Sequence, residues 1–303
     1  MLDVRKMHLL RELARLGTIA AVAQAQFCTP SAVSQQLSSL EREAGVPLIR
    51  RSGRGVELTA AGADLADRTG PVLALLEQAA AALAASRTEL AGELRIGAFQ
   101  TAVRTLLPAA LVALGAEHPR LELRVSEIDP AQVPDALRAG ALDIALVHEY
   151  DYVPAEPDPA MRTEPLLDET IFLATGQEPA ARAQAAEFEP ILAARDLPWI
   201  VASPGTLCHL MAVRLCQTAG FTPRIRHYAD DFAAVLTLVA ARQGVALVPE
   251  LALADRPDAV TLTALPVRRR TFIAYRTAAA AHPAVTACAA TIRASAATYR
   301  TGG

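Results

Sequence analysis

Two pairs of adjacent titratable residues are the first candidates for chemistry in this 303-residue sequence. Glu149 follows His148, and Asp231 follows Asp230. Together they could serve as general acid and general base, although paired acids in loops more often cap helices or face solvent. The sequence holds no G-x-S-x-G, H-E-x-x-H or G-x-G-x-x-G motif, and Lys6 is its only lysine, which excludes a phosphate-binding Gly-Lys-Ser/Thr loop in the body. The sequence therefore predicts that the protein is not an enzyme.

Four cysteines, Cys28, Cys208, Cys216 and Cys288, are the second group with chemical potential. None belongs to a Cys-x-x-Cys pair or has a histidine at zinc-ligand spacing, so we expect no metal and no cofactor. Cys208 and Cys216 fall in one predicted helix, where two helical turns separate them by about 12 Å, beyond disulfide reach without local unfolding. We expect Cys216 to be a core residue.

The elements that carry these residues alternate between strand and helix. Strands at 94–97, 121–127 and 143–147 are separated by helices at 101–114 and 133–139, and a second series runs from 169 to 248. This order predicts an α/β fold with parallel strands covered by helices. A last strand at 271–276 and a helix at 283–299 have no partner in the second series.

Ligands of open α/β sheets bind beyond the carboxyl ends of the strands, where helix N-termini present unpaired N–H groups. The residues at those ends are therefore the predicted lining of a ligand pocket: Phe99, Gln100, Thr101, His148, Glu149, Ser203, Gly205, Thr206, Cys208, Asp230 and Val248. Taken singly, Thr206 could simply cap a helix and His148 could be a surface histidine. The helix N-termini favour a small anion, such as a carboxylate, as the ligand.

Residues 1–60 predict a winged helix-turn-helix. Leucines from Leu9 to Leu16 recur at helical spacing, Gly17-Thr18 ends that helix and caps a second, and Thr29-Pro30 begins a third. After Gly45, the segment 46–58 alternates apolar and basic residues around a glycine turn, as a two-stranded wing does.

The third helix would have an apolar face for its own domain and a short polar face that can reach base edges in the major groove. The predicted DNA contacts of this helix are Thr29, Pro30, Ser31, Ser34, Gln35 and Ser38, and those of the wing are Arg50, Arg51 and Arg54. On an isolated hairpin, three arginines would be expected simply to face solvent. Beside a helix-turn-helix they indicate phosphate contact.

Charge is distributed unevenly along the chain. The whole sequence has a net charge of −3, but residues 1–60 carry +3 and the remainder −6. A basic head on an acidic body is typical of a modular protein that binds double-stranded DNA. The sequence has no secretion signal and no apolar run long enough to span a bilayer, so we expect a cytoplasmic protein without a membrane partner.

Residues 61–90 predict a long linker helix, interrupted or kinked near Gly70-Pro71. Six residues recur at alternating steps of four and three, the spacing of a coiled-coil seam: Leu65, Thr69, Val72, Leu76, Ala79 and Leu83. One helix cannot bury such a stripe alone, so we expect pairing with a second copy. The alternative is that the helix packs back on its own domain.

In its order and spacing of short motifs, the whole chain resembles the LysR-type transcriptional regulators. The motifs are Ser31–Ser34, Leu40-Glu41, Gly45–Leu48, Leu58-Thr59, Ala61-Gly62, Leu94–Gly97, Leu107-Pro108, His118-Pro119, Gly140–Ala145, Trp199-Ile200 and Gln243–Pro249. The chain departs from the family at Thr18-Ile19, Gln26 and Gln35-Gln36, which weakens any inference about the bases that are read.

The resemblance implies a winged helix-turn-helix (1–60), a linker and dimerisation helix (61–90) and a two-lobed α/β effector domain. Its lobes would comprise 91–167 with 268–303, and 168–267, joined by two crossovers as in periplasmic solute-binding proteins. The implied function is a homodimer or a dimer of dimers that binds promoter or operator half-sites under the control of a small-molecule effector between the lobes.

Three other functions remain open at this stage. Some LysR-type regulators sense peroxide with two cysteines in the region of Cys208 and Cys216, which makes redox sensing the main alternative. A cytosolic α/β enzyme would need motifs that the sequence lacks. A solute-binding protein would explain the body but would leave the DNA-binding head without a role and would require export.

Overall fold

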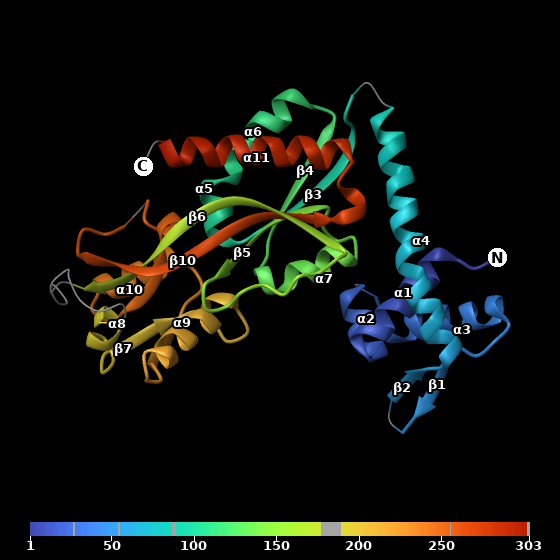
Figure 1. Ribbon diagram of the computed structural model, residues 1–303, viewed down its shortest axis with the longest axis horizontal. Helices are drawn as coiled ribbons and strands as arrows, with labels where there is room; N and C mark the ends of the chain where they lie inside the picture. The colour runs from blue at the N-terminus through green and yellow to red at the C-terminus, as the bar shows by residue number, and fades with distance from the viewer. Residues whose placement is uncertain (27, 54, 87–88, 177–188, 255, 302–303) are drawn as a thin grey trace. The chain divides into compact units, whose positions relative to one another are not determined.

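The computed structural model describes residues 1–26, 28–53, 55–86, 89–176, 189–254 and 256–301. Its backbone contacts divide the chain into two compact units, one built on the first 88 residues and the other on most of the remainder. We call residues 1–86 the head and residues 89–301 the body (Figure 1). Within the described residues, no helix is both long enough and apolar enough to cross a membrane.

The head contains the predicted winged helix-turn-helix. Its elements are α1 (Val4–Leu16), α2 (Ile19–Ala25), α3 (Pro30–Ala44), β1 (Ile49–Ser52), β2 (Gly55–Leu58) and α4 (Ala60–Ala85). Thr18, Thr29 and Thr59 each accept a backbone N–H at the start of a helix, whereas Gly17 and Gly45 end α1 and α3 with positive φ angles. One apolar core holds these elements together, with Leu10, Leu13, Val22, Val33, Leu37, Leu40 and Leu48 at its centre.

Helix α4 runs through Pro71 without ending, so of the expected interruption or kink near Gly70-Pro71 the interruption is absent. A proline inside a helix costs about 3 kcal/mol because it removes one hydrogen bond and crowds the preceding turn. Packing of α4 along α1 offsets this cost, and Ala66 and Thr69 are buried on its packed side. Tertiary contacts therefore outweigh the local signal to end the helix.

Gly62 lies where α4 passes closest to the chain that enters the wing. A Cβ at this position would lie 2.0 Å from the carbonyl oxygen of Leu48, so backbone would have to shift. We expect Gly62→Ala to lower the free energy of unfolding by about 2–3 kcal/mol, measured by denaturant unfolding. Gly70→Ala in the same helix is the matched control, because its methyl group would lie 3.8 Å from the Arg11 side chain. The control should be neutral or stabilising by up to about 1 kcal/mol, and equal losses in both variants would contradict the close approach.

The body consists of two lobes. Lobe I contains β3 (Gly92–Ala98), α5 (Gln100–Thr105), α6 (Leu107–Glu117), β4 (Leu121–Glu127), η1 (Pro130–Gln132), α7 (Val133–Arg138), β5 (Ile144–Tyr150), η3 (Thr277–Ala279) and α11 (Pro283–Thr301). Lobe II contains α8 (Glu189–Ala193), β7 (Pro198–Val201), α9 (Leu207–Thr218), β8 (Arg224–Tyr228), α10 (Phe232–Ala240), β9 (Ala246–Pro249) and η2 (Glu250–Ala252). The expected single helix over 101–114 is two helices that meet at Leu106, because Pro108 favours the first turn of a new helix.

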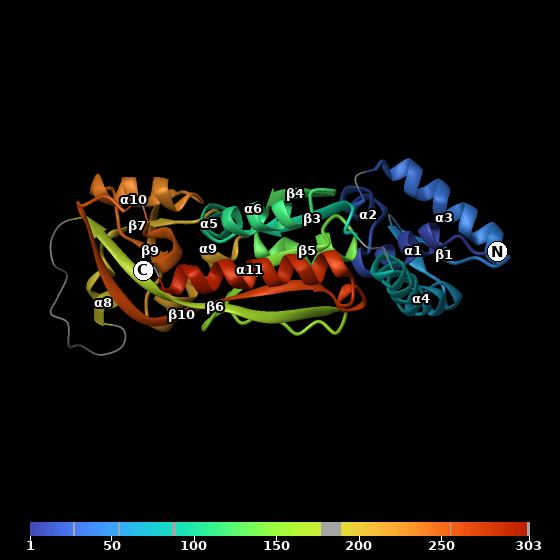
Figure 2. The ribbon, with the colours of Figure 1, turned by 90° about the horizontal axis from the view of Figure 1, so that it is seen from above.

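Two long antiparallel strands, β6 (Met161–Gly176) and β10 (Val260–Arg276), join the lobes. They pair along most of their length and run side by side from one lobe to the other (Figures 1 and 2). The six-stranded sheet has the order β4-β3-β5-β10-β6-β9, while β7 and β8 form a separate parallel pair. The predicted strand at 169–175 is the lobe II end of β6, and the predicted strand at 271–276 is the lobe I end of β10. Because β10 runs from lobe II to lobe I, the chain returns to lobe I along its last strand.

Candidate functional site

Helix α3 presents the polar face that its sequence predicts. Val33, Leu37 and Leu40 are at most 1% exposed, whereas Ser31, Gln35 and Ser38 are exposed on the other side of the helix. Thr29 is the N-cap, with Oγ1 accepting the Ala32 N–H at 3.2 Å, and Pro30 is the first helical residue. Ser34 is partly exposed, and its Oγ donates to the Pro30 carbonyl oxygen at 3.0 Å. The four side chains Ser31, Ser34, Gln35 and Ser38 therefore share one exposed surface.

The wing is the antiparallel hairpin of β1 and β2. Arg50 is exposed and forms a cross-strand ion pair with Glu57 at 2.9 Å. Arg51 lies in β1, and Arg54 lies outside the described residues. Glu41 of α3 belongs to the Leu40-Glu41 motif, but its role was not predicted: its Oε1 accepts the N–H groups of Leu48 and Ile49 at 2.9 and 3.1 Å and so fixes the start of the wing to α3.

A pocket of about 220 Å³ lies between the two lobes of the body. Seven of the predicted ligand-binding residues line it: Phe99, Gln100, Thr101, His148, Thr206, Cys208 and Asp230. The first four come from lobe I and the last three from lobe II, as expected for a site at the carboxyl ends of two sets of strands. The pocket is large enough for a small organic molecule but smaller than a typical drug-binding site.

Four other predicted residues do not line this pocket. Glu149 points away from His148 along β5, where it pairs with Arg270 at 3.2 Å. Ser203 is bonded to the Asp230 carboxylate through both its N–H and its hydroxyl, each at 2.7 Å. Gly205 supplies a turn with φ 94°, and Val248 is fully buried in the core of lobe II. Position near the end of a strand does not distinguish residues that support the pocket wall from residues that face the cavity.

Arg269 is the most buried charge in the pocket wall. It is 1% exposed and pairs with Glu169 of β6, which is 2% exposed, at 2.8 Å. Its Nη2 also donates to Thr101 Oγ1 at 3.0 Å, and its guanidinium lies 4.9 Å from the centre of the Phe99 ring. Glu169 in turn accepts the Leu251 N–H from lobe II at 2.9 Å. This network connects the base of the pocket to both lobes.

His148 lies beside this network and is 4% exposed. Burial, aided by the nearby Arg269 charge, holds the pKa of His148 well below its usual value, so the ring is neutral. Its Nδ1 has no hydrogen-bond partner among the described residues, and the ring contacts Phe99 and Tyr150 edge-on. Buried polar atoms normally have a partner, so an unpaired one in a pocket wall marks a place for a ligand or a water molecule.

Seven residues of the lining were not predicted from the sequence: Glu127, Ile128, Asp129, Pro130, Ala202, Phe232 and Arg269. Glu127 ends β4 and the next three residues follow it, so the same strand-end rule would have found them. Phe232 begins α10, directly after the paired acids at 230 and 231. Arg269 lies within β10, and no local signal distinguishes it from its neighbours Arg268 and Arg270.

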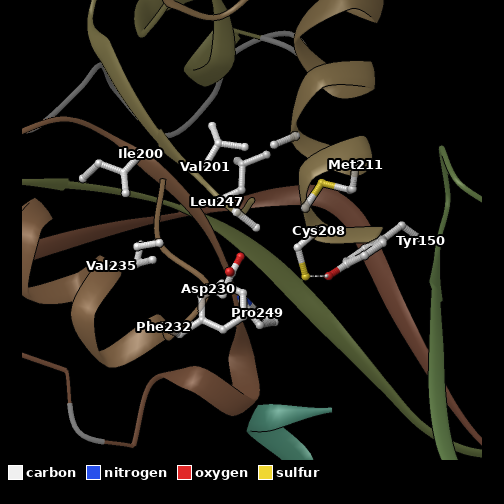
Figure 3. A pocket seen from close by; sticks show the side chains of 13 residues that line it. Tyr150, Ile200, Val201, Cys208, Met211, Asp230, Phe232, Val235, Leu247 and Pro249 are labelled. Carbon is white, nitrogen blue, oxygen red and sulfur yellow. Dashed lines mark hydrogen bonds between the residues drawn. The ribbon is translucent and has the colours of Figure 1, made fainter. Parts of the chain in front are cut away.

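Cys208 also lines a smaller cavity of about 20 Å³, which has room for about one water molecule (Figure 3). Its Sγ shares a hydrogen bond of 3.2 Å with Tyr150 Oη, drawn as a dashed line in the figure. Burial raises the pKa of the Cys208 thiol, and that of Cys216 to about 12. Both thiols lie on the continuous helix α9. Within the described residues, no group of three or more His, Cys, Asp or Glu is placed to hold a metal ion.

Comparison with known proteins identifies both units. The family model described as "Bacterial regulatory helix-turn-helix protein, lysR family" matches residues 4–63, and that described as "LysR substrate binding domain" matches residues 87–297. The chain belongs to the LysR family of transcriptional regulators. It is a DNA-binding regulator with a small-molecule effector domain, as the sequence resemblance predicted.

Named relatives of this LysR-type regulator cover most of its length. A "Probable hydrogen peroxide-inducible genes activator" of Mycobacterium avium is 31% identical over 77% of this chain and 73% of its own. The "HTH-type transcriptional activator IlvY" of Salmonella typhimurium is 28% identical over 91% of this chain and 89% of its own. These relatives are activators of different genes, so family membership alone does not select an effector.

Solved structures share the fold of this LysR-type regulator. Full-length BenM has a TM-score of 0.59 at 20% identity, covering 99% of this chain and 98% of its own. Full-length CbnR in complex with its target DNA has a TM-score of 0.52 at 21% identity, covering 97% of this chain and 100% of its own. The predicted fold class is confirmed.

Proposed function

We propose that this regulator reads DNA with the exposed face of α3 and holds the phosphate backbone with its wing. The support is the division of α3 into a buried apolar face and an exposed face of short polar side chains, which suits direct contact with base edges. Thr29 and Pro30, at the N-terminus of α3, would contact the DNA. Arg50, Arg51 and Arg54 would supply phosphate contacts, with Arg50 exchanging Glu57 for a phosphate.

The effector, in this proposal, binds in the pocket of about 220 Å³ between the lobes. One observation carries this assignment: the unpaired, buried Nδ1 of His148 in a wall built from both lobes. A ligand that contacts both lobes binds one arrangement of them better than others and so shifts the population of conformers. That difference in affinity is what control of DNA binding requires.

The same proposal includes the assembly and location of the protein. Leu75, Leu76 and Leu83 of α4 are 65%, 51% and 71% exposed, a row of apolar side chains that a second copy would cover. We propose a homodimer or a dimer of dimers, with residues 61–90 as the dimerisation helix between the DNA-binding domain (1–60) and the two lobes. The protein would act in the cytoplasm, where its DNA lies, and would have no catalytic activity.

A redox-sensing form of this function has less support, although one relative is a probable peroxide-inducible activator. Burial raises the pKa of the Cys208 thiol, which disfavours the reactive thiolate. Cys216 is two turns further along α9, about 12 Å away, so a disulfide would need local unfolding. Neither thiol is prepared for rapid oxidation.

We expect His148→Phe to reduce the effector response by at least about tenfold, because it removes the unpaired polar ring and keeps the bulk of the side chain. Affinity for DNA should be unchanged. The measurement is DNA binding by the full chain during a screen of a metabolite library, with every compound that changes binding to wild type tested on the variant. Glu149→Gln is the matched control, since its side chain lies on the opposite face of β5. A full response in His148→Phe would exclude this pocket as the effector site.

A further inference from the structure

The charges around the pocket are mostly negative. Glu127, Asp129 and Asp230 line it, and none of them forms an ion pair with another described residue. The single guanidinium of the wall, Arg269, is already balanced by the buried carboxylate of Glu169. The field inside the pocket therefore disfavours an anion and favours a cation.

Oxygens of this chain already occupy N–H groups at the starts of α9 and α10, whereas the start of α5 has no side-chain cap. At the start of α9, Thr206 Oγ1 accepts the His209 N–H, and the Leu207 N–H stabilises the Asp129 carboxylate from lobe I. At the start of α10, the Phe232 N–H is 3.5 Å from Gln100 Oε1. The sequence favours an anion because helix N-termini surround the site, whereas the acidic side chains of the lining favour a cation.

Asp129 and Asp230 face the same cavity from opposite lobes. Burial raises the pKa of Asp129, and the charge of Asp230 raises it further. Two like charges across a cleft oppose its closure, and a cation between them removes that repulsion. Such a cation would bind the closed arrangement more tightly than any open one, which is the requirement for an effector.

His148 gives an independent indication that a ligand forms a hydrogen bond in this pocket. A neutral imidazole has one nitrogen that donates and one that accepts, and Nδ1 of His148 is buried without a partner among the described residues. The wall also contains Phe99, Ile128, Pro130 and Phe232, which suit the carbon skeleton of an organic molecule better than a hydrated metal ion. The Phe232 ring can in addition interact with a cation through its face.

We propose that the effector of this regulator is a small organic molecule with a protonated amine, which binds between Asp129 of lobe I and Asp230 of lobe II. This inference rests on the proposed function of the pocket as the effector site. It names the chemical class that the pocket recognises. Glu127 at the edge of the pocket contributes to the attraction of the amine, and His148 accepts a hydrogen bond from the ligand.

The test uses pairs of probes that differ mainly in charge: benzylamine against benzoate, and putrescine against succinate. Binding to the full chain is measured by the shift in melting temperature and by calorimetry, up to about 10 mM, the range of weak fragment binding. We expect the amines to bind and the carboxylates not to bind. Asp129→Asn and Glu127→Gln should each weaken amine binding, the former by at least about tenfold. Asp196→Asn, at an exposed site with no pocket contact, should leave it unchanged.

Several results would overturn the inference, and they separate it from the proposed function. Binding of the carboxylates alone, lost in His148→Phe, would keep the pocket as the effector site but reject the amine. Stabilisation by magnesium chloride in place of the amines would make the cation a metal ion and reject the amine as well. No binding of either amine would also reject it. Amine binding that is unchanged in Asp129→Asn, Glu127→Gln and His148→Phe would place the ligand elsewhere and reject both proposals.

Discussion

Replacing Arg269 with methionine is expected to lower the free energy of unfolding by about 3–5 kcal/mol. The change leaves the Glu169 carboxylate buried, 2% exposed, without its partner at 2.8 Å, and breaking one side of a buried ion pair costs an amount of this order. It also removes the hydrogen bond to Thr101 Oγ1 and the contact with the Phe99 ring. Urea unfolding of the purified chain measures the loss.

Arg268 provides the matched control for this experiment. It is the preceding residue in β10 and pairs with Asp168 at 2.7 Å, but both side chains are about half exposed. Arg268→Met should therefore cost no more than about 1 kcal/mol. The double variant Arg269→Met with Glu169→Gln should recover part of the loss, because a glutamine oxygen can still accept the Leu251 N–H. Equal losses of unfolding free energy in Arg268→Met and Arg269→Met would show that the buried ion pair does not stabilise the contact between the lobes.

Gln35 is expected to carry the largest effect on sequence recognition. Gln35→Ala should weaken binding to the preferred DNA sequence by about 10- to 100-fold, since a good contact with a base edge contributes about 1–3 kcal/mol of discrimination. Binding to scrambled DNA should be unchanged. Arg50→Ala should instead weaken binding to both DNAs alike and reduce the salt slope by about one, because phosphates carry no sequence information.

Gln217→Ala, at an exposed position of α9 in the body, is the control for the loss of a glutamine amide on a helix surface. Fluorescence anisotropy on both DNAs, at several salt concentrations, distinguishes the variants. Unchanged sequence preference in Gln35→Ala would mean that this side chain does not reach a base.

Local patterns predict most of the helices and the head of this protein. Caps such as Thr18 and Thr29, and the glycines that end α1 and α3, act within a few residues, so the sequence is sufficient to place them. Pro71 shows the limit of such signals, since packing of α4 on α1 determines the outcome. The length of β6 and β10 depends on their pairing with each other, which no single segment reveals.

The pocket shows the same division between local and long-range information. Residues near the carboxyl ends of strands, such as Phe99 after β3 and His148 within β5, could be found because all strands of one set end on one side of the sheet. Glu149 does not line the pocket, because alternation along β5 turns it to the other face. Arg269 and its pairing with Glu169 could not be found, because only the register of β10 against β6 brings these two residues together.

Selection of DNA from a randomised pool by the purified full chain, followed by anisotropy on the selected sequence, tests the central claim most directly. We predict enrichment of two related half-sites at a spacing of about one helical turn or a multiple of it. We also predict that the selected DNA is bound about 1,000-fold more tightly than scrambled DNA of equal length at moderate salt. A pool that yields no common sequence, with equal and salt-sensitive binding to both DNAs, would contradict a head that reads sequence through α3.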